Sequence, residues 1–221
     1  MKRMWCISEI NQEFRERMYK ILDLYEKPYD PRYPVVGFDE KPKQLIEDMK
    51  KAVLMTPGHR KKCDYEYIRR GNANILMAIE FKAGKRTARV TSQRTKRDFS
   101  KFIKHLVDRV YPDAERLHLV LDNLNTHNES AIYEMYDSEE AERILSKIEF
   151  HYTPLHASWL NVAEIEIGVM DTECTQRRIP DKKILRREVM AWERKRNKLK
   201  MKINWKFTKR IADEKLSSYY V

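Results

Sequence analysis

The stretch RLHLVLDN, residues 116–123, decides the fold class of this 221-residue chain. Its apolar residues run almost without interruption, which is typical of a strand covered on both faces. Before it come a group of antiparallel strands (residues 65–93, with a turn at Ala83–Lys85) and a helix (95–111). After it we expect a helix (130–146), a strand (147–153) and a helix from about Asn161. This order predicts an α/β fold with a mixed sheet and helices on its faces.

The segments at the two ends of the chain are expected to be helical. A helical spacing of apolar residues covers 7–26, and the prolines of PYDPRYP end it before a short strand at 34–40. A loop is expected at 55–64. The last 40 residues are basic and helix-prone, with Trp192, Trp205 and Phe207 as anchors. We therefore divide the chain into an N-terminal helix and linker (1–32), a catalytic domain (33–180) and a basic helical segment (181–221).

The charge balance of the chain favours a polyanionic partner. The formal net charge is +11 and the pI is about 9.4, so nucleic acid is the first candidate and a solvated basic enzyme the plain alternative. No window approaches a membrane span, and no secretory signal is evident. Cys6, Cys63 and Cys174 have no zinc-binding spacing, so they are expected to be reduced thiols of a cytoplasmic, nucleoid-associated protein.

Two acids follow apolar strands. Asp39 is expected to close the strand VVGFD, and Asp122 closes LHLVLD. Functional groups gather at the carboxyl ends of strands in α/β sheets, so the two carboxylates are candidates for one site. The alternative for each is an ordinary turn residue, because aspartate commonly ends strands.

A third acid lies in HYTPLHASWLNVAEIEI, residues 151–167. If Asn161 caps the helix, Glu164 occupies the third helical position, where a capping box is the alternative to a catalytic role. Glu166 lies about 200° further round the helix, so only one of the two glutamates can face the site. We expect that one to be Glu164, with Glu166 pointing towards the basic C-terminal segment.

Three clustered carboxylates repel one another unless cations lie between them. Two Mg²⁺ or Mn²⁺ ions suit such hard oxygen ligands and would serve phosphoryl transfer. The basic surface would then hold a DNA backbone while the acids hold the metals that cut it.

Three blocks of the sequence, VVGFDEKPKQL, HLVLDNLNTHN and HYTPLHASWLNVAEIE, resemble the motifs of DDE-superfamily transposases of the bacterial insertion-sequence branch related to mariner. The likeness covers nearly the whole chain. It implies an RNase H-like (retroviral-integrase-like) five-stranded mixed sheet, with Asp39, Asp122 and Glu164 as the acidic triad. It also implies metal-dependent DNA cleavage and strand transfer by a homodimer assembled on double-stranded DNA, the element ends and the target.

Two features depart from that family pattern. Forty-one residues separate Asp122 from Glu164, more than is typical of mariner-related enzymes, and YDSEEAERILSK is expected to carry the extra length as helix. The chain also begins just ahead of the catalytic blocks, whereas such transposases usually carry N-terminal helix-turn-helix domains. A fragment and the second frame of a split gene are both open, and we expect weakly specific DNA binding.

Other residues near the motifs have two interpretations each. Asn123, Asn125 and His127 either orient the metal site or form an Asx turn. Trp159 is expected to be a core anchor rather than a base-stacking residue. Candidates for contacts with the DNA backbone, each of which is otherwise a solvated surface charge, are Lys41, Lys43, Arg69, Arg70, Arg94, Lys96 and Arg97.

The sequence therefore predicts a DNA transposase catalytic domain. Two alternatives remain open: an RNase H-like, structure-selective nuclease that only hydrolyses DNA, and a non-catalytic DNA-binding transposase remnant. Intact acids at all three positions argue against the remnant.

Overall fold

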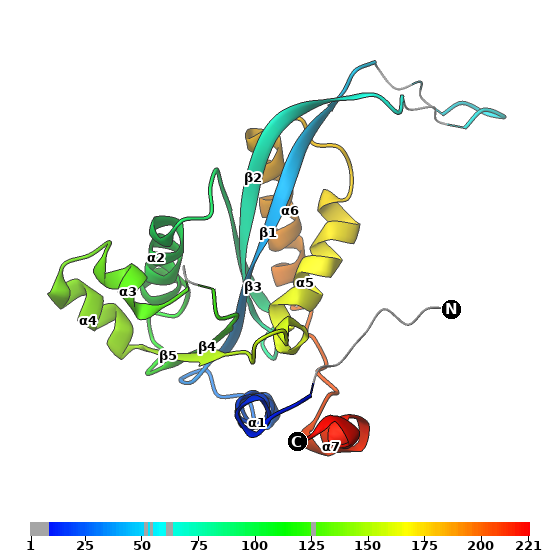
Figure 1. Ribbon diagram of the computed structural model, residues 1–221. Coiled ribbons are helices and arrows are strands. Elements are labelled where there is room, and N and C mark those ends of the chain that lie inside the picture. Colours follow the sequence, from blue (N-terminus) through cyan, green and yellow to red (C-terminus); the bar gives the residue numbers. More distant parts are fainter. Residues whose placement is uncertain (1–8, 51–52, 54, 61–63, 125–126) are drawn as a thin grey trace.

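A computed structural model describes residues 9–50, 53, 55–60, 64–124 and 127–221. At its centre is the predicted five-stranded mixed sheet, whose strand order is β3-β2-β1-β4-β5 (Figure 1). β2 pairs antiparallel with both β1 and β3, whereas β4 pairs parallel with both β1 and β5. The strands are β1 Val35–Asp48, β2 Tyr67–Glu80, β3 Lys85–Thr91, β4 Leu117–Leu121 and β5 Ile148–Tyr152.

Helices cover both faces of this sheet (Figure 1). One face packs against α2 (Lys96–His105), which continues to Val110, and against α3 (Glu129–Tyr133) and α4 (Ser138–Ser146). The other face packs against α5 (Val162–Met170), which continues to Thr175, and α6 (Lys182–Lys198). Since helices lie on both sides, β4 is apolar throughout apart from His118, in agreement with the pattern that predicted it.

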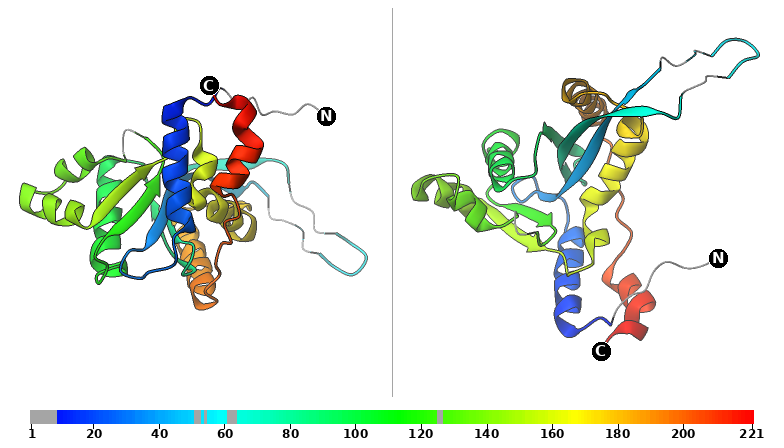
Figure 2. Two further views of the ribbon diagram at one scale, coloured as in Figure 1. Left: turned by 90° about the horizontal axis from the view of Figure 1, so that it is seen from below. Right: turned by 45° about the horizontal axis from the view of Figure 1, so that its top comes forward.

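The two ends of the described chain lie together. α1 (Gln12–Glu26) and α7 (Lys209–Leu216) run side by side, as Figure 2 shows, and share an apolar cluster with Trp159, Trp205 and Phe207. Trp192 packs in the core between α6 and β3. Among the described residues, no helix is long and apolar enough to cross a membrane.

The first strand is longer than predicted. β1 runs from Val35 to Asp48, so Asp39 lies inside the strand and does not close it. The added part contains Pro42, and proline lacks the N–H that a central strand needs. Beyond Gly37, however, β1 has β2 on one side only, and a proline is tolerated at such an edge.

The helix expected over 130–146 is two helices. Asp137 caps α4 by accepting a hydrogen bond from the Glu140 backbone N–H (2.9 Å), and this cap separates α4 from α3. α4 does fall within YDSEEAERILSK, as expected. The N-terminal helix begins at Gln12 rather than at residue 7, after the cap Asn11. Cys174 is a half-buried free thiol, and Cys6, Cys63 and Asn125 lie outside the described residues.

β1 and β2 extend beyond the body of the molecule as a hairpin arm, defined here as the described residues of 49–66 with the adjoining strand ends (Figure 1). The loop expected at 55–64 falls within it. Several large apolar side chains of the arm are exposed: Met49, Val53, Met55, Tyr65 and Tyr67.

Candidate active site

The parallel pairing of β1 and β4 places the first two acids side by side. The last parallel pair joins Gly37 to Val120, and Asp39 and Asp122 each lie two residues beyond it. Both carboxylates are half-buried at the same end of these two strands. Both therefore lie just past the carboxyl end of the parallel part of the sheet, as predicted, although β1 itself continues antiparallel to β2.

The start of α5 is held tightly against β1. The Asn161 side chain caps α5 by accepting a hydrogen bond from the Ala163 N–H (3.1 Å), and it donates one to the Phe38 carbonyl (2.7 Å). Only glycine fits at position 37, because a Cβ there would lie 2.5 Å from Cγ1 of Val162. From α1, the Tyr25 hydroxyl donates to the Leu160 carbonyl (3.0 Å) and accepts from the N–H of Val162 (3.2 Å).

This docking puts Glu164 in the first turn of α5, three residues after its cap, with an exposed side chain. The capping-box alternative is not supported, because the Asn161 N–H donates to the Ser158 carbonyl (2.7 Å). Glu166 points the other way, as predicted. It is fully buried and paired with Arg86 of β3 (2.8 Å) and with Arg196 of α6 (2.8 Å), which belongs to the basic C-terminal segment.

The three carboxylates influence one another. Burial, together with the negative charges of Asp122 and Glu164, raises the pKa of Asp39 to about 7, against a hydrogen bond from the Glu40 N–H (2.7 Å). A carboxyl in this state binds a proton where a cation would otherwise lie. The three carboxylates therefore act on one another's charge, although their oxygens do not all lie within 4.8 Å of one another.

His127 anchors the second acid. Its Nδ1 lies 2.7 Å from Oδ1 of Asp122 and its Nε2 lies 3.1 Å from Oε1 of Glu40, while the ring packs on Phe38 and Phe99. Burial lowers the pKa of His127, but the hydrogen bonds to the two carboxylates outweigh it and raise the pKa to about 9. His127 is thus doubly protonated at neutral pH and orients Asp122.

Sequence reasoning did not identify Glu40, Tyr25 or Gly37 as part of this site. Glu40 follows Asp39 in β1, so its side chain leaves the opposite face of the strand, but it rejoins the site through His127. The only sequence signal for this link is the acidic pair Asp39-Glu40 combined with the histidine of DNLNTH, and the pairing needs the fold to be seen.

The other predicted residues lie at different distances from this centre. Asn123 is exposed directly after Asp122. Trp159 is a packing residue, edge-on to Phe207 at 5.3 Å between ring centroids, as predicted. Arg94 reaches Glu40 (3.4 Å), which brings a half-exposed positive charge to the edge of the site.

Most of the predicted DNA-contact residues are engaged with the protein. Lys41 pairs with Asp171 (3.2 Å), Arg70 with Glu47 and Lys96 with Glu134, while Lys43 donates to the carbonyls of Thr175 and Arg177. Arg69 and Arg97 are exposed.

The sequence of residues 34–186 matches the DDE superfamily endonuclease family. Among curated proteins, none matches the chain in sequence. Two solved structures share the fold: the Mos1 mariner paired end complex with Mn (TM-score 0.55) and that with Mg (TM-score 0.56), each at 13% identity over 91% of this chain.

The chain spans 62% and 61% of the length of those two Mos1 chains. At this identity the likeness establishes the architecture, an RNase H-like sheet with flanking helices. The family match covers both strands that carry the aspartates and the helix that carries Glu164. The chain therefore belongs to the DDE superfamily endonuclease family, and residues 34–186 are its DDE endonuclease domain.

Proposed function

We propose that this chain is the catalytic domain of a DNA transposase of the mariner-related insertion-sequence branch, with Asp39, Asp122 and Glu164 as the acids that bind two Mg²⁺ or Mn²⁺ ions. The observation that carries the proposal is the convergence of the three carboxylates, close enough for the charges of Asp122 and Glu164 to add to burial in raising the pKa of Asp39. We retain the division into 1–32, 33–180 and 181–221, with the middle part as the catalytic unit.

The residues of the chain fit this use. Bound divalent ions would stabilise the attacking and the leaving oxygens of a phosphodiester. His127 orients one oxygen of Asp122 and leaves the other available, and the cap at Asn161 fixes the first turn of α5, from which Glu164 projects. Arg94, beside Glu40 at the edge of the site, supplies positive charge for a phosphate of the bound strand.

DNA is the substrate that the overall charge supports. A net charge of +11 on a chain whose catalytic centre is acidic suits a polyanion held by surface lysines and arginines around the site. Exposed Arg69 and Arg97 are the first candidates for backbone contacts, because Lys41 and Lys43 are already engaged. The setting we propose is DNA of the nucleoid in the cytoplasm.

We further propose a homodimer assembled on DNA, with the hairpin arm as part of the contact. Met55 and Tyr65 are 75% and 84% exposed on this arm, and such apolar side chains on a projecting hairpin favour a protein partner. Mass photometry on DNA should show two chains for the wild type and one for a Met55→Lys/Tyr65→Lys variant. Equal dimer fractions would remove the arm from the interface.

The experiment that separates transposition from plain hydrolysis offers a duplex with a free 3′-hydroxyl end and a supercoiled target in Mg²⁺. A transposase joins the end to the target and produces a branched or longer strand. Nicks without joined products would assign the chain to structure-selective hydrolysis, and the absence of both, with the protein folded, would support a DNA-binding remnant.

A further inference from the structure

A second cluster of metal-binding side chains lies on the sheet away from the acidic triad. It consists of His118 on β4 and Glu149 and His151 on β5. The parallel register pairs His118 with Glu149, and His151 lies two residues further along β5 on the same face. Asp122 lies four positions after His118, about 13 Å along an extended chain, so the cluster is distinct from the acidic triad.

The spacing of its atoms matches a tetrahedral metal. Nδ1 of His118 lies 3.0 Å from Nε2 of His151, and the Glu149 oxygens lie 3.4 Å and 3.5 Å from these two nitrogens. Metal–ligand bonds of about 2.0–2.1 Å at tetrahedral angles put ligand atoms about 3.3–3.4 Å apart. Within the described chain, this is the only group of three such residues whose ligand atoms all lie within 4.8 Å of one another.

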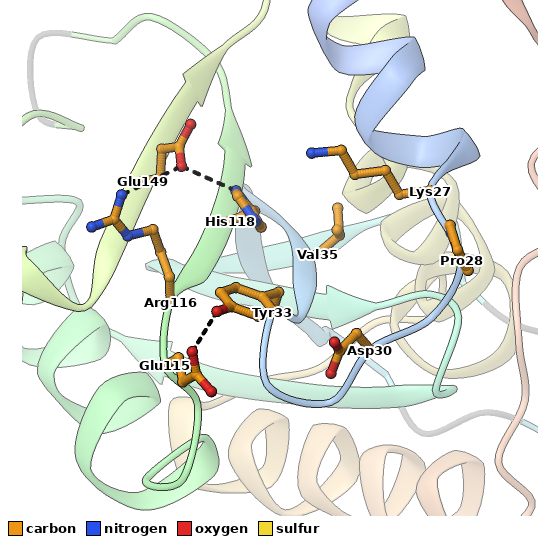
Figure 3. Close-up of a pocket in the computed structure, with 9 residues that line it drawn as sticks. All are labelled: Lys27, Pro28, Asp30, Tyr33, Val35, Glu115, Arg116, His118 and Glu149. Carbon is orange, nitrogen blue, oxygen red and sulfur yellow. Dashed lines mark hydrogen bonds and ion pairs between the residues drawn. The ribbon is translucent and has the colours of Figure 1, made fainter.

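The surroundings leave room for a fourth ligand. A cavity of about 670 Å³ is lined by His118, Glu149 and Tyr33, and Figure 3 shows Glu149 reaching His118 from the neighbouring strand. The side chains of His118 and His151 are only 12% and 16% exposed, and a second, smaller cavity separates His151 from Ile21 of α1. Sites with three protein ligands keep such an open position for water or another ligand.

The two rings face each other through the nitrogens that a metal would use. Nδ1 of His118 and Nε2 of His151 are hydrogen-bonded to each other, and each ring would have to keep its proton on its other nitrogen if both bound an ion. Burial lowers the pKa of both histidines, that of His151 to about 4.

Two cationic side chains near the cluster oppose binding. Lys27 lines the same cavity, and its positive charge adds to burial in lowering the pKa of both histidines. Arg116 lies 3.9 Å from Glu149 with more than half of its side chain exposed, and a contact of this kind contributes little. Asp30 and Glu115 line the same cavity and add negative charge around it. The balance of charge around the cluster therefore does not exclude a divalent ion.

We propose that His118, Glu149 and His151 form a zinc-binding site that joins β4 to β5 on the α1 side of the sheet. Nitrogen ligands select zinc over the magnesium that suits the all-carboxylate centre, so the chain would carry two kinds of metal site. A zinc ion here would link β4, which leads into Asp122, to β5.

The test is a zinc titration of the full chain against a chromophoric chelator, in excess Mg²⁺ to occupy the carboxylate centre. We expect one zinc per chain. Removing a group that hydrogen-bonds to a zinc ligand lowers zinc affinity about 10–100-fold. Removing a ligand itself, as in His118→Gln and His151→Gln, should therefore lower zinc affinity at least about 100-fold. The Glu149 side chain is 45% exposed, so Glu149→Gln should disturb folding least of the three variants. It should also weaken zinc binding.

His59, exposed on the hairpin arm, gives the matched control, and His59→Gln should bind as the wild type does. X-ray absorption of the zinc-loaded chain should show two imidazole nitrogens at about 2.0–2.1 Å and no sulfur. The melting temperature should rise with added zinc in the wild type and not in His151→Gln. Unchanged affinity in folded histidine variants, sulfur ligands, or no zinc binding in excess Mg²⁺ would each overturn the proposal.

Discussion

Replacing Asp39 with asparagine should make the metal-free protein more stable at alkaline pH. The pKa of Asp39 is about 7 in the fold against an ordinary value of 3.8. A raised carboxyl pKa means that the folded state holds its proton longer than the unfolded state does. Stability is therefore lost as pH rises from about 4 to about 7, and the loss is complete above that range.

The size of the effect follows from the difference between these two pKa values. At about 1.36 kcal/mol for each pKa unit, the loss is about 4 kcal/mol at pH 8.5 and roughly 1.5 kcal/mol at pH 5. The asparagine amide keeps an oxygen that can accept the hydrogen bond from the Glu40 N–H, so the replacement should preserve the local structure. The free energy of unfolding of Asp39→Asn in EDTA should thus exceed that of the wild type, by more at pH 8.5 than at pH 5.

Urea denaturation of both proteins at the two pH values measures this difference. Asp113→Asn, at an exposed acid of the turn before β4, is the matched control and should change neither value. Added Mg²⁺ should stabilise the wild type at pH 8.5 more than the variant, because the ion replaces the proton. An Asp39→Asn protein that is equally or less stable at pH 8.5, or a difference independent of pH, would show that the pKa of Asp39 is not raised in the fold.

Three further outcomes follow from the packing and charge of the chain. Glu166→Gln should lower the free energy of unfolding by about 3–5 kcal/mol in urea, since Arg86 and Arg196 stay buried without their partner; an unchanged midpoint would contradict this. Gly37→Ala should lower the free energy of unfolding by about 1–3 kcal/mol and slow DNA cleavage, because the new Cβ would lie 2.5 Å from Cγ1 of Val162 and push α5 away from β1. A fully active, equally stable variant would show that the close approach of α5 to β1 is not needed. DNA affinity should fall about 10³–10⁵-fold between roughly 50 and 200 mM salt if six to ten phosphates are contacted, as fluorescence anisotropy can measure, whereas a flat response would exclude backbone contacts.

The surroundings of Glu166 were predictable from the sequence only in part. Helix periodicity alone separated Glu164 from Glu166 and predicted that Glu166 points towards the basic C-terminal segment. The structure places Glu166 in a buried ion pair, so its loss is expected to affect folding as well. The direction of the side chain was predictable from the 100° step of the helix, but its two arginine partners come from β3 and α6 and needed the tertiary fold.

Other features divide in the same way into those set by neighbouring residues and those set by the tertiary fold. The apolar run of β4 and the cap at Asn161 were readable because each depends on neighbouring residues. The full length of β1 was not, since a proline at position 42 is acceptable only once the sheet order leaves that edge open. The links from Glu40 to His127 and from His118 to His151 depend on strand register, which local pattern does not give.

Mg²⁺-dependent nicking of supercoiled DNA by the wild type, Glu164→Gln and Asp122→Asn, with unfolding curves for each, tests whether the acidic triad is catalytic. The wild type should nick only with Mg²⁺ or Mn²⁺. Both variants should lose that activity while they remain folded and bind DNA as tightly as the wild type. A folded Glu164→Gln protein that nicks DNA at the wild-type rate would contradict the assignment of the acidic triad.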